Sequence, residues 1–166
     1  MTAPASRRGA GRALANVATR LAIGLLRGVA RLPYPLVRRL GEATGELVWR
    51  LAARRRRITL TNLALCFPQW SEERRVAVGR EHFRCFMRSV LDRFILWFDP
   101  PERLCELVRL EGLENYLPYL GKPVILLAPH FAGLDAGGMR FQVDYPAASM
   151  FAMQKNPVMN EVMTRG

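Results

Sequence analysis

The net positive charge of this chain lies entirely in its first third. Residues 1–57 contain 13 arginines and two glutamates, so their balance of +11 equals the net charge of all 166 residues. Residues 58–166 are neutral in sum, with 12 basic and 12 acidic side chains. Such an excess calls for an anionic partner, either nucleic acid or anionic lipid. The sequence therefore predicts two parts, a basic segment over 1–57 and a domain over 58–166.

Residues 13–32 form an apolar run that three arginines interrupt, Arg20, Arg27 and Arg31. Their spacing of seven and four places them on one side of a helix. They leave no uninterrupted stretch for a signal peptide, and a mid-span arginine costs a spanning helix about 2.5–3.5 kcal/mol. We therefore expect a helix in the membrane interface, its arginines reaching the headgroups, with a spanning helix and ordinary burial as alternatives.

A second amphipathic helix is predicted over Tyr34–Ala53, after the break at Pro33, and it ends in four consecutive arginines. Arginines beside amphipathic helices suit anionic headgroups, although a solvated helix end is the alternative. The arginines assigned to membrane binding are Arg20, Arg27, Arg31, Arg54, Arg55, Arg56 and Arg57. No aromatic residues alternate with these arginines, and no known nucleic-acid-binding motif is present, so nucleic acid is not the predicted partner.

A long helix is predicted over Glu72–Phe98. Ser71 is a good helix cap, two glutamates follow it, and Asp99-Pro100-Pro101 stops the helix. Apolar residues recur within it at three- and four-residue steps, which predicts one packed face. The chain has three cysteines, Cys66, Cys85 and Cys105, and their odd number and wide spacing argue against a metal or redox site. We expect them to be free thiols that are buried as small hydrophobic residues.

Residues 124–128, Val-Ile-Leu-Leu-Ala, form a continuous apolar run of strand length. Such a run is typical of a strand covered on both faces, and Leu107–Glu111 is a second candidate strand. The predicted fold class is therefore α/β, with amino-terminal membrane-interacting helices followed by the first part of a mixed sheet flanked by helices. His130 follows the run, and Gly133–Val143 is predicted to be helical, so His130 lies where a strand gives way to a helix. Active sites collect at such points.

His130 and Asp135 are the candidate catalytic pair. A carboxylate in the first turn of the following helix can accept the Nδ1 proton of His130 and leave Nε2 to take a proton from a substrate hydroxyl. Gly133 between them permits close approach of a substrate. No supported serine or cysteine nucleophile lies nearby, which favours direct attack by the substrate. On spacing alone, a loop histidine and a helix-capping aspartate are an equal alternative.

The setting of this pair, Gly-Lys-Pro-Val-Ile-Leu-Leu-Ala-Pro-His-Phe-Ala-Gly-Leu-Asp over 121–135, resembles the late acyltransferases of lipid A biosynthesis. A second stretch, Arg-Ile-Thr-Leu-Thr-Asn-Leu-Ala-Leu-Cys-Phe-Pro over 57–68, resembles the signature that those enzymes carry before their first long helix. Residues 151–157 resemble a third element of that family, which begins with an aromatic residue and ends in Asn-Pro. Where many members carry an arginine, this chain has Ala152. Lys155 is the candidate cation for a phosphate or oxyanion, with an ordinary surface lysine as an equal alternative, and Asn156 follows it.

The resemblance implies transfer of a fatty acyl chain from acyl carrier protein to a hydroxyl of a lipid A precursor, at the cytoplasmic face of the inner membrane. His130 would be the general base, Asp135 its partner, and Lys155, Asn156 and Gly133 substrate-binding residues. No metal or cofactor is implied. Because family members are considerably longer, the chain is expected to be an amino-terminal portion. A noncatalytic peripheral membrane protein, or an inactive fragment of the enzyme, is the alternative.

Overall fold

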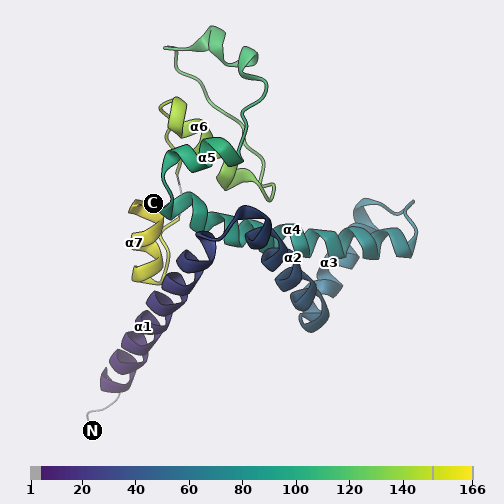
Figure 1. The fold of residues 1–166 in the computed structure, drawn as a ribbon. Helices are drawn as coiled ribbons and strands as arrows, with labels where there is room; N and C mark the ends of the chain where they lie inside the picture. The colour runs from purple at the N-terminus through teal and green to yellow at the C-terminus, as the bar shows by residue number, and fades with distance from the viewer. Residues whose placement is uncertain (1–4, 151, 166) are drawn as a thin grey trace.

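In the computed structural model, residues 5–150 and 152–165 are described, and every regular element among them is helical (Figure 1). The α-helices are α1 (Ala5–Ala30), α2 (Tyr34–Leu51), α3 (Ala53–Cys66), α4 (Glu72–Phe98), α5 (Pro101–Leu107), α6 (Leu134–Asp144) and α7 (Pro157–Arg165). Two 3-10 turns, η1 (Leu113–Asn115) and η2 (Leu117–Tyr119), lie between α5 and α6.

Helix α4 is the element against which α1, α2, α3, α6 and α7 all pack. The Oγ of Ser71 caps it by accepting a hydrogen bond of 3.3 Å from Arg74 N, and Glu72 and Glu73 occupy its first turn. It ends at Phe98, before Asp99 and two prolines. Its predicted bounds are confirmed, because a serine cap, acids in the first turn and prolines after the end are local signals that need no tertiary contact.

The hydrophobic core joins the two parts that the charge distribution separates. Its buried members come from α1, α2 and the second half of α4: Ala30, Val37, Leu91, Phe94 and Ile95. Farther along the α2–α4 contact, the rings of Trp49 and Phe83 meet edge to face at 5.2 Å. Helices α1 and α2 are therefore packed into the same core as α4, in addition to carrying the positive charge.

Helices α2 and α4 approach closely because α2 presents two glycines to α4. A Cβ on Gly41 would lie 2.7 Å from the Cα of Arg88, and one on Gly45 would lie 2.5 Å from the Cα of Arg84. These are contacts with backbone atoms, so neither position has room for a side chain. The four-residue spacing places both glycines on one face of α2, where they allow close contact between the two helices.

Arginines of α4 flank this crossing, and the two glutamates of residues 1–57 form ion pairs with them. Glu46 accepts two hydrogen bonds of 2.5 Å from Arg80, and Glu42 pairs with Arg88 at 3.3 Å. Glu46 is 17% exposed, and its hydrogen bonds, chiefly that from Arg80, lower its pKa from 4.5 to about 2. The acidic residues of the basic segment are thus placed where they hold α2 to α4.

The α/β prediction is wrong for this chain, since no strand occurs within the described residues. Residues 123–130 have no regular structure, and Ile125 and Leu127 are 97% and 96% exposed. The other candidate strand, Leu107–Glu111, begins at the end of α5 and continues without regular structure. A strand needs a neighbour to satisfy its backbone groups and helices to cover its faces, and no second strand lies beside this one in the part that the structure describes.

The cysteine prediction is confirmed in one respect and wrong in another. All three cysteines are free thiols. Cys66 and Cys105 are exposed, and Cys85 is half-buried, so they are not the core residues that were expected. Cys66 ends α3, in which no residue is buried, and Cys105 lies on the short helix α5, in which Leu104 alone is buried. Burial depends on that tertiary placement, which cysteine spacing does not reveal.

The glycine crossing leads to a stability prediction. Gly45→Ala should lower the free energy of unfolding by about 1–3 kcal/mol, because the new methyl group meets α4 backbone that cannot move aside alone. Gly24→Ala on α1, where no atom lies within 4 Å of the added Cβ, should instead raise it by about 0.5–1 kcal/mol. Urea unfolding of both variants checks this. Equal effects in the two would show that the α2–α4 contact is not close-packed.

Glu46 leads to a prediction about pH. Its pKa is lower in the folded chain than the ordinary value of 4.5, so its contribution to stability is full above pH 4.5 and is lost as the pH falls towards about 2. The midpoint of urea unfolding should decrease as the pH is lowered from 4.5 to about 2. In the Glu46→Gln variant this decrease should be smaller. Glu111→Gln, which removes an exposed glutamate without an ion pair in the described part of the chain, should leave the slope unchanged.

Candidate active site

His130 lies on a loop without regular structure that leads into a helix, so the helix after it is as predicted and the strand before it is not. Phe131 N donates to Pro129 O at 2.8 Å, and Leu134 N donates to Phe131 O at 3.1 Å. Helix α6 begins after Gly133 and carries Asp135 in its first turn, where the helix dipole favours a carboxylate. The predicted placement of Asp135 in the first turn of a helix after His130 is confirmed.

Asp135 is paired with Arg93 of α4. The Nε of Arg93 donates to the Oδ2 of Asp135, and the two side chains are 42% and 44% exposed. Among the described residues, no hydrogen bond or ion pair joins His130 to Asp135, and His130 is exposed. The structure therefore brings the aspartate of the candidate pair to an arginine from the core helix and leaves the histidine in solvent on the preceding loop.

Sequence reasoning missed Arg93, although a signal was present. Residues 90–98 are largely apolar and form the packed half of α4, and Asp92 and Arg93 are the charges within them. A charged residue in an apolar stretch usually needs a partner from another element. The sequence does not identify that partner as Asp135, because only the tertiary fold brings α6 to α4.

Helix α6 is fixed at its other end by contacts away from His130. Arg140 Nε donates to Val108 O at 3.1 Å, and its Nη1 pairs with Asp144 at 2.6 Å. The rings of Tyr116, Phe141 and Tyr145 pack together with centroids 5.0–5.1 Å apart. The orientation of α6, and hence the position of Asp135, is thus set by two arginines at opposite ends of the helix.

The third predicted element lies against α1. Asn156 Oδ1 accepts from Val158 N and Met159 N, at 2.9 and 3.2 Å, and so caps α7, while its Nδ2 donates to Thr19 Oγ1 at 3.0 Å. Lys155 is exposed. Phe151 lies outside the described residues. Within the described chain, no hydrogen bond or ion pair joins Lys155 or Asn156 to His130, Asp135 or Gly133.

The predicted membrane-binding arginines differ in how far the fold uses them. Arg56 donates to the carbonyls of Trp49 and Arg50, at 2.7 and 3.2 Å, and so satisfies the end of α2. Arg27 lies over the ring of Phe98, 4.9 Å from its centroid. The remaining five are exposed at the surface: Arg20, Arg31, Arg54, Arg55 and Arg57.

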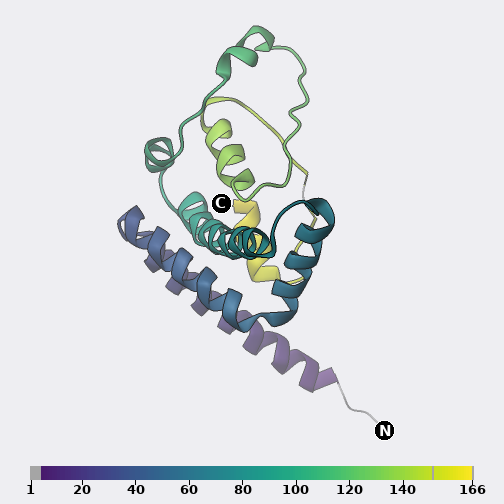
Figure 2. The same cartoon turned by 90° about the vertical axis from the view of Figure 1, so that its right-hand side faces the viewer.

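Helix α1 also exposes an apolar stripe. Its members, each more than half exposed, are Leu14, Val17, Leu21 and Leu25. The helix is long and apolar enough over Ala13–Ala30 to cross a membrane, with a mean hydropathy of 1.3 and only 6% of that stretch buried. Figure 2 shows α1 and α2 along one edge of the molecule, with the other helices on the far side of them. The described chain thus has an exposed apolar surface beside its positive charge.

Comparison with known proteins places this chain in a family of transferases. The family model for bacterial lipid A biosynthesis acyltransferase matches residues 8–166. The chain therefore belongs to the bacterial lipid A biosynthesis acyltransferases. Both motifs on which the resemblance rested, at 57–68 and 121–135, lie within the matched residues, so the prediction of this family is confirmed.

Individual relatives agree with the family match. The chain is 31% identical over 150 residues to the lipid A biosynthesis lauroyltransferase of Escherichia coli (strain K12), covering 89% of this chain and 49% of the relative. It is 32% identical over 146 residues to the palmitoleoyltransferase of the same strain, covering 87% and 48%. The chain spans about half the length of the curated relatives it matches. No solved structure matches it significantly.

Proposed function

We propose that this protein transfers a fatty acyl chain from acyl carrier protein to a hydroxyl of a lipid A precursor. The observation that carries the proposal is the family match over residues 8–166. The relatives are named for different acyl groups, lauroyl and palmitoleoyl among them, so membership of the family assigns the reaction type without assigning the chain length.

In the proposed mechanism His130 is the general base. As the acceptor hydroxyl oxygen attacks the thioester carbonyl, Nε2 of His130 takes its proton, and the new carbon–oxygen bond forms. The tetrahedral intermediate collapses by breaking the carbon–sulfur bond, and the imidazolium returns the proton to the departing thiolate. The exposure of His130 supports this role, because two large substrates must reach one imidazole.

Asp135 is the proposed partner of His130, and Arg93 is compatible with that role. A carboxylate has two oxygens and about four acceptor sites, so Oδ2 can stay with Arg93 while Oδ1 accepts from Nδ1 of His130. The change required is a movement of the short loop between His130 and α6. Hydrogen bonds between catalytic groups are often completed only when substrate binds.

The remaining proposed roles are substrate positioning and membrane contact. Lys155, an exposed cation, is proposed to hold an anionic substrate group, and Gly133 to allow close approach at the start of α6. Asn156 also keeps its proposed substrate-binding role, although both ends of its amide already fix α7 to α1. Residues 1–57 are proposed to hold the protein on the cytoplasmic face of the inner membrane through arginine side chains and the apolar stripe of α1.

A noncatalytic membrane-binding protein is the second candidate. The pairing of Asp135 with Arg93 rather than with His130 favours it. Transfer of a labelled acyl chain from carrier protein to the lipid A precursor separates the two candidates, since only the enzyme moves the label.

The proposed dyad leads to a prediction about rate. His130→Ala should lower the rate of acyl transfer by about 10²–10⁴, the usual contribution of general-base catalysis, while the exposed position leaves the fold intact. Asp135→Asn should also lower the rate, and the double variant should be little slower than His130→Ala, because the two residues act as one unit.

The chain offers a matched control for this experiment. His82, its only other histidine, is exposed on α4, so His82→Ala should keep full activity. Circular dichroism verifies that each variant folds. Full activity in a folded His130→Ala protein would rule out the mechanism and favour the noncatalytic candidate.

The proposed membrane contact leads to a further prediction. Replacing Leu21 and Leu25 of the α1 stripe by Gln should weaken binding to phosphatidylglycerol vesicles by at least about tenfold, because apolar burial contributes about 0.8 kcal/mol per CH₂ group. Replacing Leu117 and Leu120, which are similarly exposed leucines on the turns before α6, should leave binding unchanged. Sedimentation with vesicles measures both, and equal losses would contradict the assignment of α1.

A further inference from the structure

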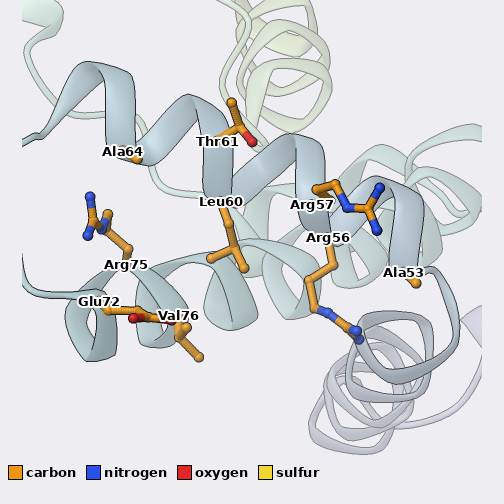
Figure 3. A pocket seen from close by; sticks show the side chains of 9 residues that line it. All are labelled: Ala53, Arg56, Arg57, Leu60, Thr61, Ala64, Glu72, Arg75 and Val76. Carbon is orange, nitrogen blue, oxygen red and sulfur yellow. The ribbon is translucent and has the colours of Figure 1, made fainter.

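A groove of about 470 Å³ lies between α3 and the first two turns of α4, away from the candidate active site (Figure 3). It is lined by Ala53, Arg56, Arg57, Leu60, Thr61, Ala64, Glu72, Arg75 and Val76. Figure 3 shows Arg75 near Ala64 at one end, Arg57 towards Ala53 at the other, and Leu60 between them. The groove therefore has cations at both ends and an apolar middle.

Two of the three groove arginines are left unused by the fold. Arg56 is committed to the carbonyls at the end of α2. Nearby Arg74, which is outside the groove, lies over the ring of Trp70 at 4.3 Å. By contrast, the side chains of Arg57 and Arg75 make no hydrogen bond, salt bridge or ring contact within the described chain, although the pKa of Glu73 is lowered chiefly by a backbone hydrogen bond and also by the charge of Arg75. Three arginines against the single carboxylate of Glu72 leave a net positive groove that suits an anionic group.

We propose that this groove binds the phosphate headgroup of an anionic phospholipid, with Arg57 and Arg75 as its ligands. The proposal rests on the membrane association proposed above and adds a defined site to it. Guanidinium groups are the preferred partners of phosphate because their forked donors match its oxygens. The guanidinium groups of Arg57 and Arg75 point to opposite ends of the groove in Figure 3, so both side chains turn towards Leu60 when they hold one headgroup.

The surroundings favour a lipid over other anions. Ile58 and Leu65, seven residues apart on α3, are exposed on one face of that helix, and Leu51 is exposed at the adjoining end of α2. Apolar side chains beside a basic groove suit the boundary between headgroups and acyl chains. Nucleic acid would instead call for aromatic side chains that stack on bases, and the groove lining has none.

The groove is separate from the candidate active site. Arg75 and Arg93 lie 18 positions apart on the continuous helix α4, which corresponds to about 27 Å at 1.5 Å per residue. A headgroup held by Arg75 is therefore too far from Asp135 for its own hydroxyls to react there. The lipid in the groove acts as an anchor for the protein and is not the acyl acceptor.

The test compares two pairs of arginines in the whole chain. Arg57→Gln with Arg75→Gln removes two charges from the groove, whereas Arg54→Gln with Arg55→Gln removes two from the same arginine run outside it. General attraction to an anionic surface predicts equal losses, about 30-fold for two charges. A specific site in the groove instead predicts that the variant with both groove arginines replaced binds phosphatidylglycerol vesicles at least about tenfold more weakly than the control variant.

A third variant gives an effect of opposite sign, which misfolding does not produce. Glu72→Gln removes the carboxylate that opposes the phosphate and should strengthen vesicle binding several-fold. Arg57→Lys with Arg75→Lys keeps both charges but loses the forked donors, and should bind between the wild type and the Gln pair. Unfolding midpoints of all variants exclude a global loss of structure.

Each outcome decides the proposal. A selective loss in the groove pair together with a gain in Glu72→Gln supports it. Equal losses in the two pairs overturn the groove while leaving general membrane association intact. A wild-type chain that does not bind the vesicles overturns both. A groove pair that loses affinity for duplex DNA, but not for vesicles, overturns the lipid assignment in favour of nucleic acid.

Discussion

The contact between α2 and α4 is the constraint on which the rest of the structure depends. Gly41 and Gly45 allow close approach of two helix backbones, and Glu42 and Glu46 form ion pairs with the arginines that this approach brings together. Without the glycines the helices would separate, and without the glutamates cations from both helices would repel each other at the crossing. Shape and charge at one interface thus explain how so basic a segment packs against the domain.

Because α4 is held in this way, it connects the functional regions of the chain. Its first turns form one wall of the basic groove, its middle receives α2, and its last turns carry both the core and Arg93. Helix α6, with Asp135, is therefore oriented by the same helix that binds the basic segment. A surface that docks on a membrane through α1, α2 and the groove would fix the direction in which the candidate site faces.

The sequence predicted the parts of the structure that depend on local signals. Ser71 and Asp99 bound α4, and the turn before α6 follows from Gly133 and the residues around it. The absence of a sheet could not be predicted from such local signals. The apolar run at 124–128 forms a strand only if a neighbouring strand is present to pair with it. The family was predictable for a different reason, since its motifs at 57–68 and 121–135 are short stretches that can be recognised without knowledge of the fold.

Arg93 shows what the candidate site gains from the fold beyond its two motif residues. A carboxylate that only capped α6 would be free to rotate, and it would lose rotamer entropy on pairing with an imidazole. In the proposed dyad, Arg93 holds Oδ2 from a helix whose second half lies in the core, so this cost would be met before substrate binds. The remaining step is to place the His130 side chain against the free oxygen Oδ1. Substrate binding would then have to order the short loop that carries His130, and not the carboxylate.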